Sequence, residues 1–462
     1  MSKNQEIPNG WALVKLSDLV VDPKKDLVDG PFGSDLKADE YTDSGVPVFK
    51  IQNIKANQFL DKKINYIKKE KAKSLSRHSF ISGDLIITKL GYPLGLCCKV
   101  PEKYKYGIIV ADLMRLRPNK MVVYDQFLIY AINCNVVQNQ FKAITKGTTR
   151  PRVNLTIVRD IELALPPLLE QQRIVARIEE LFSSLEKGIE SLKTAQQQLK
   201  IYRQAVLKWA FEGKLTNTNV KEGELPEGWQ KVNLGEISEK IQIGPFGTQL
   251  HKEDYIMGGI PLINPMHFKD GVIEADSSYS ITKKKRDSLP NYILKEGDII
   301  MGRRGEMGRY GLVRKKEAGY FCGTGSLYIR PKSKVANSIF LFHCLKGRIV
   351  KKYLEENAAG TTMANLNAKI VNGIPICLPS IKEQQTIVAE IESRLSVCDK
   401  IEESIEQSLK QSESLRQSIL KKAFEGKLVP QDPNDEPASK LLERIKAEKE
   451  KTESKKKKGR LS

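Results

Sequence analysis

The sequence predicts an α+β fold in which two similar mixed α/β domains are joined by two long helices that form an antiparallel coiled coil. Three observations predict this fold. The chain repeats itself at an interval close to half its length, short β-rich runs alternate with helical stretches in each repeat, and each repeat ends in an apolar pattern of heptad period. A chain of 462 residues is long enough for two or three domains, each with a core of its own.

The repeat is visible as short strings that occur in both halves of the chain. The matching pairs are "AFEGKL" at 210–215 and 423–428, "LEQQRIVARIE" at 169–179 with "KEQQTIVAEIE" at 382–392, and "GPFGSDL" at 30–36 with "GPFGTQL" at 244–250. The offset is 213 residues for the first two pairs and 214 for the third. This period exceeds that of solenoid and propeller repeats, so each copy is expected to be a unit of domain size.

The first part of each copy is expected to be globular. Runs such as 84–90 and 297–304 favour strands, the stretch 124–144 favours a helix, and glycine and proline separate these elements. The expected organisation is a first domain over 1–165, a first long helix with its linker over 166–222, a second domain over 223–378, a second long helix over 379–428 and a partly disordered tail over 429–462.

The second part of each copy has the period of a coiled coil. Apolar residues recur at steps of three and four, which indicates a heptad seam and not the stripe of an ordinary surface helix. The predicted seam positions are Ile174, Ile178, Leu181, Leu185, Leu192 and Leu199 in the first helix and Ile387, Ile391, Leu395, Ile405, Leu415 and Ile419 in the second. Proline precedes each helix, and Gly213 and Gly426 in the repeated "AFEGK" suit the left-handed conformation that ends a helix.

The chain is strongly basic. Its formal net charge is +20, which favours a polyanionic partner such as nucleic acid or an anionic membrane surface; a soluble protein from a lysine-rich proteome is the alternative. Neither a signal peptide nor an apolar run of the ~20 residues that a spanning helix needs is recognisable, so a cytoplasmic protein without membrane contact is expected. The seven cysteines form no CxxC pair and fit free thiols, so no metal site is expected.

Catalytic motifs are missing from the sequence. There is no GxxxxGK[ST] phosphate loop, and "NPMH" at 264–267 lacks the second proline and the aromatic residue that hold an exocyclic amine for methyl transfer. Glu212 and Lys214 match only one end of a nuclease metal site and lie at a helix stop, and the four histidines stand apart. We therefore predict no catalytic residue on this chain.

Two pairs of loops carry the residues that are predicted to contact DNA. One pair follows an apolar strand at 83–95 and 297–309, and the other contains a repeated "GTT" at 147–149 and 360–362. The candidates are Lys89, Tyr92, Thr148, Thr149, Arg150, Arg152, Arg303, Arg304, Arg309, Thr361 and Thr362. Glycine lets the backbone approach a phosphodiester, arginine offers a fork that suits guanine O6 and N7, and hydroxyls contact phosphates or bases. A hairpin with a solvated basic rim, or ordinary loop chemistry, is the alternative.

The third repeated loop has a less definite meaning. "GPFGS" and "GPFGT" have the composition of tight turns, in which Phe32 and Phe246 could be core anchors or stacking residues. The two copies agree in their turns and differ in the side chains that could read bases. This combination is typical of duplicated sequence readers with different targets.

The order of these motifs, from GPFG[ST] and the Gly-Asp strand to the LPxxxEQQ helix and its AFEGKL stop, resembles the specificity subunit of a type I restriction-modification system. The resemblance implies that each globular domain reads one half of a split double-stranded DNA target. It also implies that the paired helices fix the spacing and dock two methyltransferase subunits, which restriction subunits then join. S-adenosylmethionine, ATP and Mg are then expected on those partners, with no cofactor on this chain.

Two other classes of function remain as alternatives. A self-contained DNA methyltransferase or restriction enzyme would need the motifs that are missing, and a coiled-coil scaffold would use the basic surface only for solubility. The lysine-rich end at 454–462 could attract phosphates without reading sequence, or have no role.

Overall fold

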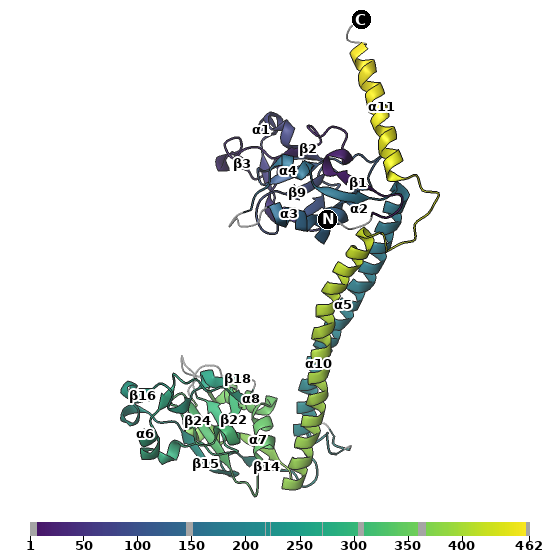
Figure 1. Ribbon diagram of the computed structural model, residues 1–462. Coiled ribbons are helices and arrows are strands. Elements are labelled where there is room, and N and C mark those ends of the chain that lie inside the picture. Colours follow the sequence, from purple (N-terminus) through teal and green to yellow (C-terminus); the bar gives the residue numbers. More distant parts are fainter. Residues whose placement is uncertain are drawn as a thin grey trace. The chain divides into compact units, whose positions relative to one another are not determined.

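The computed structural model separates the chain into two compact units (Figure 1). The first unit contains Met1–Ser191 and Ser408–Ser462, and the second contains Leu192–Gln407. The structure describes residues 7–144, 151–217, 219–221, 223–269, 271–303, 309–358 and 366–458. The two long helices, α5 (Leu168–Phe211) and α10 (Ile381–Phe424), each contribute one part to the first unit and one part to the second.

Short sheets make up the globular part of the first unit. In their order across each sheet the strands are β10 (Cys97–Lys99), β9 (Leu85–Thr88), β12 (Leu113–Leu116) and β2 (Leu27–Asp29); β3 (Tyr41–Thr42), β7 (Asn65–Ile67), β4 (Val46–Phe49), β11 (Tyr106–Ile109) and β8 (Ser79–Ile81); β1 (Ala12–Lys15) with β13 (Glu162–Leu165); and β5 (Ile54–Lys55) with β6 (Gln58–Phe59). All pairings are antiparallel except that of β4 with β11.

The second unit repeats this topology. Its strands are β22 (Tyr310–Leu312), β21 (Ile299–Gly302), β24 (Ser326–Pro331) and β15 (Ser238–Ile243); β16 (Tyr255–Ile256), β20 (Ser280–Ile281), β17 (Ile260–Ile263) and β23 (Phe321–Cys322); β14 (Gln230–Asn233) with β25 (Pro375–Leu378); and β18 (Phe268–Lys269) with β19 (Val272–Ile273). The order β22-β21-β24-β15 corresponds element by element to β10-β9-β12-β2, and β17 pairs with β23 in parallel as β4 does with β11. The duplication that the sequence predicts is therefore also a duplication of fold.

Short helices complete each globular part. They are α1 (Lys69–Ser74), α2 (Asp125–Asn133), α3 (Asn135–Ile144) and α4 (Leu155–Arg159) in the first unit, and α6 (Lys283–Ser288), α7 (Ser338–Leu345), α8 (Arg348–Ala358) and α9 (Ala368–Asn372) in the second. The predicted helical stretch 124–144 is interrupted at Cys134, which is extended (φ −74°, ψ 156°). Asn154 and Asn367 cap α4 and α9 in the same way, because each side chain accepts a hydrogen bond from the backbone N–H three residues later at 2.9 Å.

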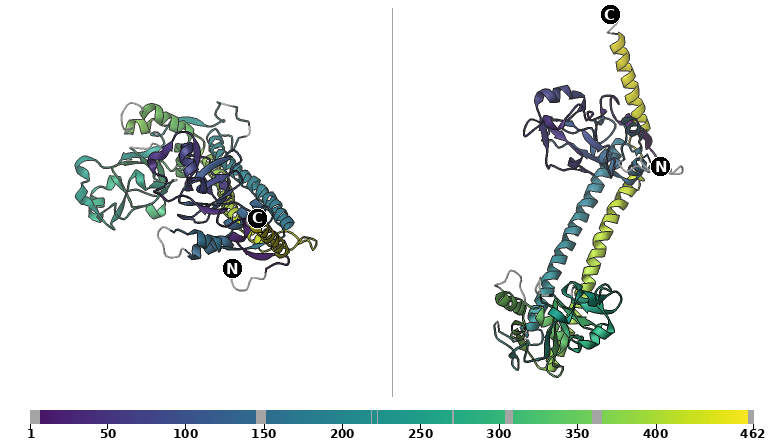
Figure 2. Two further views of the ribbon diagram at one scale, coloured as in Figure 1. Left: turned by 90° about the horizontal axis from the view of Figure 1, so that it is seen from above. Right: turned by 90° about the vertical axis from the view of Figure 1, so that its left-hand side faces the viewer.

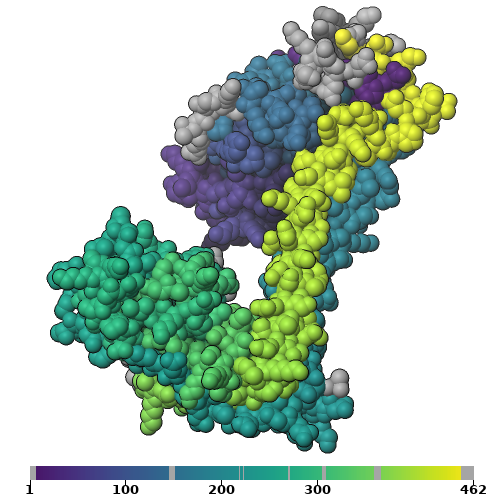
Figure 3. All heavy atoms as spheres, turned by 60° about the horizontal axis from the view of Figure 1, so that its bottom comes forward, coloured from purple at the N-terminus to yellow at the C-terminus, as the bar shows by residue number. Residues whose placement is uncertain are grey.

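Helices α5 and α10 lie side by side and antiparallel (Figures 2 and 3). In the first unit the start of α5 contacts the end of α10, as in the ion pair between Glu186 and Arg416 at 3.2 Å. In the second unit the end of α5 contacts the start of α10, where Arg203 donates hydrogen bonds to Asp399 and Glu402 at 2.7 and 2.9 Å. This confirms the predicted pairing of the two long helices.

The predicted seam is buried unevenly. Ile174, Ile178, Ile387 and Ile391 are fully buried because they also pack into the globular cores. Leu199, Ile405 and Ile419 are buried, and Leu181, Leu185, Leu192 and Leu395 are half-buried. Leu415 differs from the prediction, since it is 51% exposed. In a pair of helices, each helix is covered along one stripe only. A seam position that is slightly displaced from this stripe, as Leu415 is, therefore lies at the edge of the contact and stays exposed.

The repeated "AFEGK" string packs against another string present in both copies, "PNGW" at 8–11 and "PEGW" at 226–229. The Lys214 N–H bonds to the Trp209 carbonyl at 2.8 Å, and Gly213 has φ +73°, which is the left-handed helix stop that the sequence predicts. A Cβ on Gly213 would lie 2.1 Å from Pro226 Cγ, and one on Gly426 would lie 2.5 Å from Pro8 Cγ. Each helix therefore ends in a glycine because a proline of the neighbouring segment occupies the space of a side chain.

The "EQQ" string joins each long helix to its globular part. Glu170 accepts a hydrogen bond from Trp11 Nε1 at 3.0 Å, and Glu383 accepts the equivalent bond from Trp229 Nε1 at 3.1 Å. Burial raises the pKa of Glu170, and the hydrogen bond from Trp11 opposes that rise. The next residue, Gln171, donates to the carbonyls of Val122 and Pro166. These bonds attach the start of α5 to the globular part of the first unit.

The tail contains a helix that the sequence did not predict, α11 (Ala438–Lys458). Its first turns are anchored in the first unit, where Ala438, Leu441 and Ile445 are buried. The Ala438 N–H bonds to the Gly10 carbonyl at 2.9 Å, and Asp435 forms an ion pair with Arg173 at 2.5 Å. The segment from Ser408 onward thus belongs to the first unit, and its residues between Ile419 and Ile445 contribute to the core of that unit.

Candidate nucleic-acid interface

Two of the predicted loops of the first unit lie against each other at the end of β9. The Val153 N–H bonds to the Lys89 carbonyl and the Gly91 N–H to the Pro151 carbonyl, both at 3.1 Å. Leu90 and Arg152 form an antiparallel bridge. Loops that are about 60 residues apart in sequence therefore form one surface.

The GPFG loop is the third member of this cluster. The Gly30 N–H bonds to the Leu113 carbonyl at 3.0 Å, and a Cβ on Gly30 would lie 2.0 Å from the Val110 carbonyl oxygen. The preceding residue, Asp29, accepts a hydrogen bond from Lys89 Nζ at 2.9 Å. Only glycine fits this approach, which brings the GPFG turn beside the Lys89 loop.

The structure gives the three described candidates of the first unit different environments. Lys89 is 8% exposed and its ammonium is paired with Asp29, so it joins two loops, and its contact with DNA stays a prediction. Tyr92 is 83% exposed. The Arg152 guanidinium is largely exposed and lies 3.3 Å from Asp112, in a pair that is weak because water screens it. Of these three candidates, Tyr92 and Arg152 are thus the accessible side chains.

The second unit builds the same cluster from its own copy. The Arg303 N–H bonds to the Gly325 carbonyl at 2.9 Å, and the Leu366 N–H bonds to the Arg303 carbonyl at 3.1 Å. The Gly244 N–H bonds to the Ser326 carbonyl at 2.9 Å, which places the second GPFG turn beside the same strand ends. Arg303 is half-buried and Arg309 is exposed. The remaining candidates, Thr148, Thr149, Arg150, Arg304, Thr361 and Thr362, lie outside the described residues.

The sequence left the role of the two GPFG phenylalanines open, and the structure places neither in the core. Phe32 is 78% exposed and Phe246 is 65% exposed. Gly30 and Pro31 are buried before Phe32, as Gly244 and Pro245 are before Phe246. The signal that could have pointed to a surface role was the identity of the string in two copies whose other loop residues differ.

The Gly-Asp strings have a structural role beneath this surface. Asp84 is 2% exposed and accepts two hydrogen bonds from Arg117, both at 2.8 Å. Asp298 is 1% exposed and accepts the equivalent pair from Arg330 at 2.8 and 2.7 Å. These bidentate ion pairs hold β9 and β21, whose ends carry the loops, against their neighbouring strands.

Several cysteines and one histidine lie in environments that lower their reactivity. All seven cysteines are free thiols, and burial raises the pKa of Cys98 to about 12. Burial also lowers the pKa of His343 to about 4. Within the described ranges, no group of three or more His, Cys, Asp or Glu side chains could hold a metal ion. Over the same residues, no helix combines the length and the apolar character that crossing a bilayer requires.

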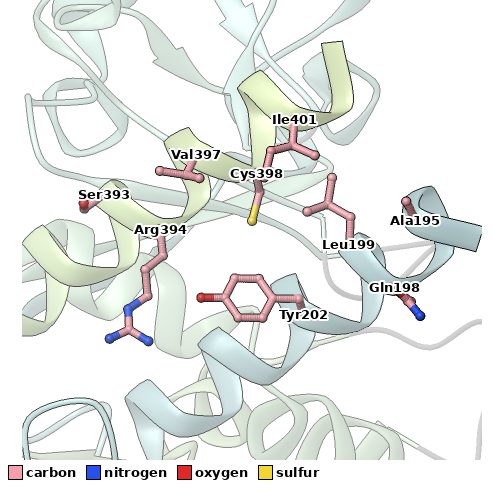
Figure 4. Close-up of a pocket in the computed structure, with 9 residues that line it drawn as sticks. All are labelled: Ala195, Gln198, Leu199, Tyr202, Ser393, Arg394, Val397, Cys398 and Ile401. Atoms are coloured by element: carbon pink, nitrogen blue, oxygen red, sulfur yellow. The ribbon is translucent and has the colours of Figure 1, made fainter. Parts of the chain in front are cut away.

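A second candidate surface lies on the long helices within the second unit. A cavity of about 470 Å³ opens between them, lined by Ala195, Gln198, Leu199 and Tyr202 of α5 and by Ser393, Arg394, Val397, Cys398 and Ile401 of α10 (Figure 4). Val397, Ile401 and Tyr202 are 54%, 44% and 40% exposed. Apolar side chains around a hollow of this kind are typical of a surface that receives another protein.

Comparison with known proteins gives consistent matches along the chain. A family model described as the type I restriction modification DNA specificity domain matches residues 8–194 and 226–411, once in each repeat. The chain is 28% identical over 387 residues to the specificity subunit of the type I restriction enzyme EcoBI of Escherichia coli, covering 79% of both chains. It is 25% identical to the StySPI specificity subunit of Salmonella potsdam, covering 96% of both.

The fold is also similar to that of a solved structure. The HsdS subunit from Thermoanaerobacter tengcongensis superposes with a TM-score of 0.63 at 22% identity, over 92% of this chain and 99% of that one. A structure described as bearing on complex assembly and conformational transition of the type I R-M system superposes with a TM-score of 0.64 over 91% of this chain. These likenesses support the two-domain fold with paired helices.

Proposed function

Because the chain belongs to the family of type I restriction-modification DNA specificity proteins, we propose that it is a non-catalytic subunit that reads a bipartite DNA target, one half-site with each unit. The observation that carries the proposal is the matched loop cluster. Both units join the loop after the central strand to a second loop, through Leu90 with Arg152 and through Arg303 with Leu366. The backbone framework is shared while the exposed side chains differ, as two readers of different half-sites require.

The proposal assigns chemistry to partner subunits. S-adenosylmethionine is expected on two methyltransferase subunits, and ATP and Mg on the subunits that complete the complex, including restriction subunits. The hollow around Val397 and Ile401 supports docking of a methyltransferase subunit, since water-exposed apolar residues of this kind gain free energy when a partner covers them. A self-contained enzyme is disfavoured by the buried thiols and by the low pKa of His343.

Selection from a random DNA library tests the reading function. The chain, assembled with its methyltransferase partner, is expected to select two short sequences separated by a constant spacer. The isolated chain is expected to transfer no methyl group to DNA. Selection of no consensus would favour the scaffold alternative, and methyl transfer by the isolated chain would favour the enzyme alternative.

Replacing Arg303 with alanine is expected to affect one half-site only. If its guanidinium reads a base, binding should weaken by about 1–3 kcal/mol and the consensus should relax in that half alone. The measurement is repeated library selection with the variant. Arg314→Ala, which removes an exposed arginine of the same unit outside the loop cluster, is the matched control. Equal relaxation of both halves would place Arg303 on the phosphate backbone or in the fold.

We further propose that α5 and α10 set the spacer between the half-sites. Four helix-forming residues inserted between Thr194 and Leu199 lengthen α5 by about 6 Å. This corresponds to nearly 2 base pairs of duplex at about 3.4 Å each, and a four-residue stutter is a distortion that coiled coils absorb. Methylation mapping in cells that carry the variant should show both half-sites unchanged and a spacer longer by one or two base pairs. An active variant with an unchanged spacer would show that the helices do not set it.

A further inference from the structure

Phe32 and Phe246 are the same residue displayed in the same way by two units. In both loops a buried glycine and a buried proline come immediately before the ring, and three exposed residues follow it. The rings are 78% and 65% exposed. A single exposed aromatic residue is common on protein surfaces, but a matched pair at equivalent positions of a duplicated fold indicates a shared contact.

The backbone holds each ring in a fixed place. Before Phe32, the Gly30 N–H bonds to Leu113; after it, the Asp35 N–H bonds to the Phe32 carbonyl at 2.9 Å. In the second unit the Gly244 N–H bonds to Ser326, and Phe246 directly precedes a 3₁₀ turn over Gly247–Gln249. A ring on a backbone that is held from both sides costs little loop ordering when it binds, which favours its use as an anchor.

The position of the rings relates them to the candidate DNA surface. Asp29, three residues before Phe32, is bonded to Lys89 of the central loop. Gly244, two residues before Phe246, is bonded to Ser326, beside the Gly325 carbonyl that accepts the Arg303 N–H. Each ring is therefore attached to the loop cluster through one or two residues of rigid backbone.

We propose that Phe32 and Phe246 are the sequence-independent apolar contacts of the two units with duplex DNA, each packing on a base or deoxyribose beside its half-site. This inference rests on the proposed function and adds to it. Every nucleotide of a duplex presents a deoxyribose, and any base step offers base faces to a ring that wedges between its bases, so an aromatic contact tolerates any sequence. That tolerance explains why both units carry the same ring while Tyr92, Arg152 and Arg303 have no identical counterparts.

The surroundings of the rings favour DNA over a protein partner. The exposed residues after Phe32 are Gly33, Ser34 and Asp35, and those after Phe246 are Gly247, Thr248 and Gln249. A protein interface has a core of several apolar residues, whereas each ring here has a hydroxyl two residues later, on Ser34 or Thr248, that can donate a hydrogen bond to a phosphate. The Asp35 carboxylate cannot donate such a bond, so the phosphate contact beside Phe32 is assigned to Ser34.

The test compares Phe32→Ala, Phe246→Ala and the double variant, each as the full chain assembled with its methyltransferase partner. The probes are a duplex with the selected consensus and duplexes in which one half-site is scrambled. Each single variant is expected to raise Kd roughly tenfold, with the double variant near the product of the two. The consensus and the slope of log K against log salt should stay unchanged, because no phosphate contact is removed. Met121→Ala and Met257→Ala, which remove side chains that are 61% and 81% exposed, are the controls.

The outcomes separate this inference from the proposed function. If the unaltered complex selects no DNA sequence, the proposed function itself fails. If the unaltered complex binds its consensus and both phenylalanine variants bind equally well, this inference alone is overturned. Loss of the methyltransferase from the complex, with DNA affinity kept in whatever complex forms, would assign the rings to a protein contact and also overturn it. Circular dichroism of each variant, compared with Phe32→Trp and Phe246→Trp, which keep an aromatic face, shows whether a loss is due to unfolding.

Discussion

Replacing Asp298 with alanine is expected to lower the free energy of unfolding of the second unit by about 3–5 kcal/mol. The loss arises because Arg330 stays in the core without its carboxylate partner. The Asp298 side chain is 1% exposed and that of Arg330 is 13% exposed, so the variant leaves a guanidinium with little access to water and without the two bonds that neutralise it. Hydrogen exchange of the β21 and β24 amides measures this unit by itself and should accelerate by a hundredfold to several thousandfold.

Two matched variants define the cause of this loss. Glu390→Ala breaks an ion pair with Arg394 on the surface of α10 and should change stability by less than about 1 kcal/mol. Asp298→Leu combined with Arg330→Met removes both charges and should recover much of the loss. A cost below about 1 kcal/mol for Asp298→Ala would mean that Arg330 finds a sufficient replacement, such as the Ile293 carbonyl at 3.3 Å.

Placing carboxylates in the hollow between the helices is expected to abolish methylation. Val397→Asp with Ile401→Asp changes side chains that are 54% and 44% exposed, so the stability of the chain itself should change by only about 0.5 kcal/mol per site. A docked subunit would have to desolvate both charges, which costs several kcal/mol when no partner is provided. Methyl transfer by the mixture of subunits should fall at least a hundredfold, and the methyltransferase should no longer co-elute with the chain.

The control for this prediction lies on the same helix. Glu406 is exposed and lies about 180° around α10 from Val397 at about 100° per residue, so Glu406→Lys changes charge on the face away from the hollow. It should assemble and methylate normally. Full methylation by the aspartate variant would show that the hollow is not the docking surface, and equal loss in both variants would point to a general effect of charge on the helix.

Features that depend on a few neighbouring residues could be predicted from the sequence. The stop at Gly213 and the heptad period of the long helices both follow from local rules of backbone geometry. Leu415 departs from that pattern, because the period specifies an apolar stripe but not how far a partner helix covers it. The duplication of the fold was predictable because the same short strings occur in both halves of the sequence.

Features that depend on distant pairing could not be predicted. Lys89 follows an apolar strand in a glycine-rich loop, which predicts a contact with DNA. Its hydrogen bond to Asp29, 60 residues earlier, cannot be seen in the local sequence. The sequence leaves Phe32 as either a core anchor or a stacking residue, because the burial of Gly30 and Pro31 that precedes the exposed ring depends on strands elsewhere in the chain. Helix α11 lacks an apolar stripe over most of its length, and its first turns are held by contacts with the first core, in which Ala438, Leu441 and Ile445 are buried.

The first unit is made of two segments that are separated in the chain, and this affects when it can fold during synthesis on the ribosome. The second unit is one uninterrupted segment, Leu192–Gln407, and can fold as soon as it has emerged. The first unit is begun earlier but completed later, because Ile419, Phe424 and Leu441 fill its core. The apolar surface of its first segment therefore stays uncovered while more than 200 further residues are translated. A premature stop codon after Gln407 would consequently damage the domain made first and spare the domain made second.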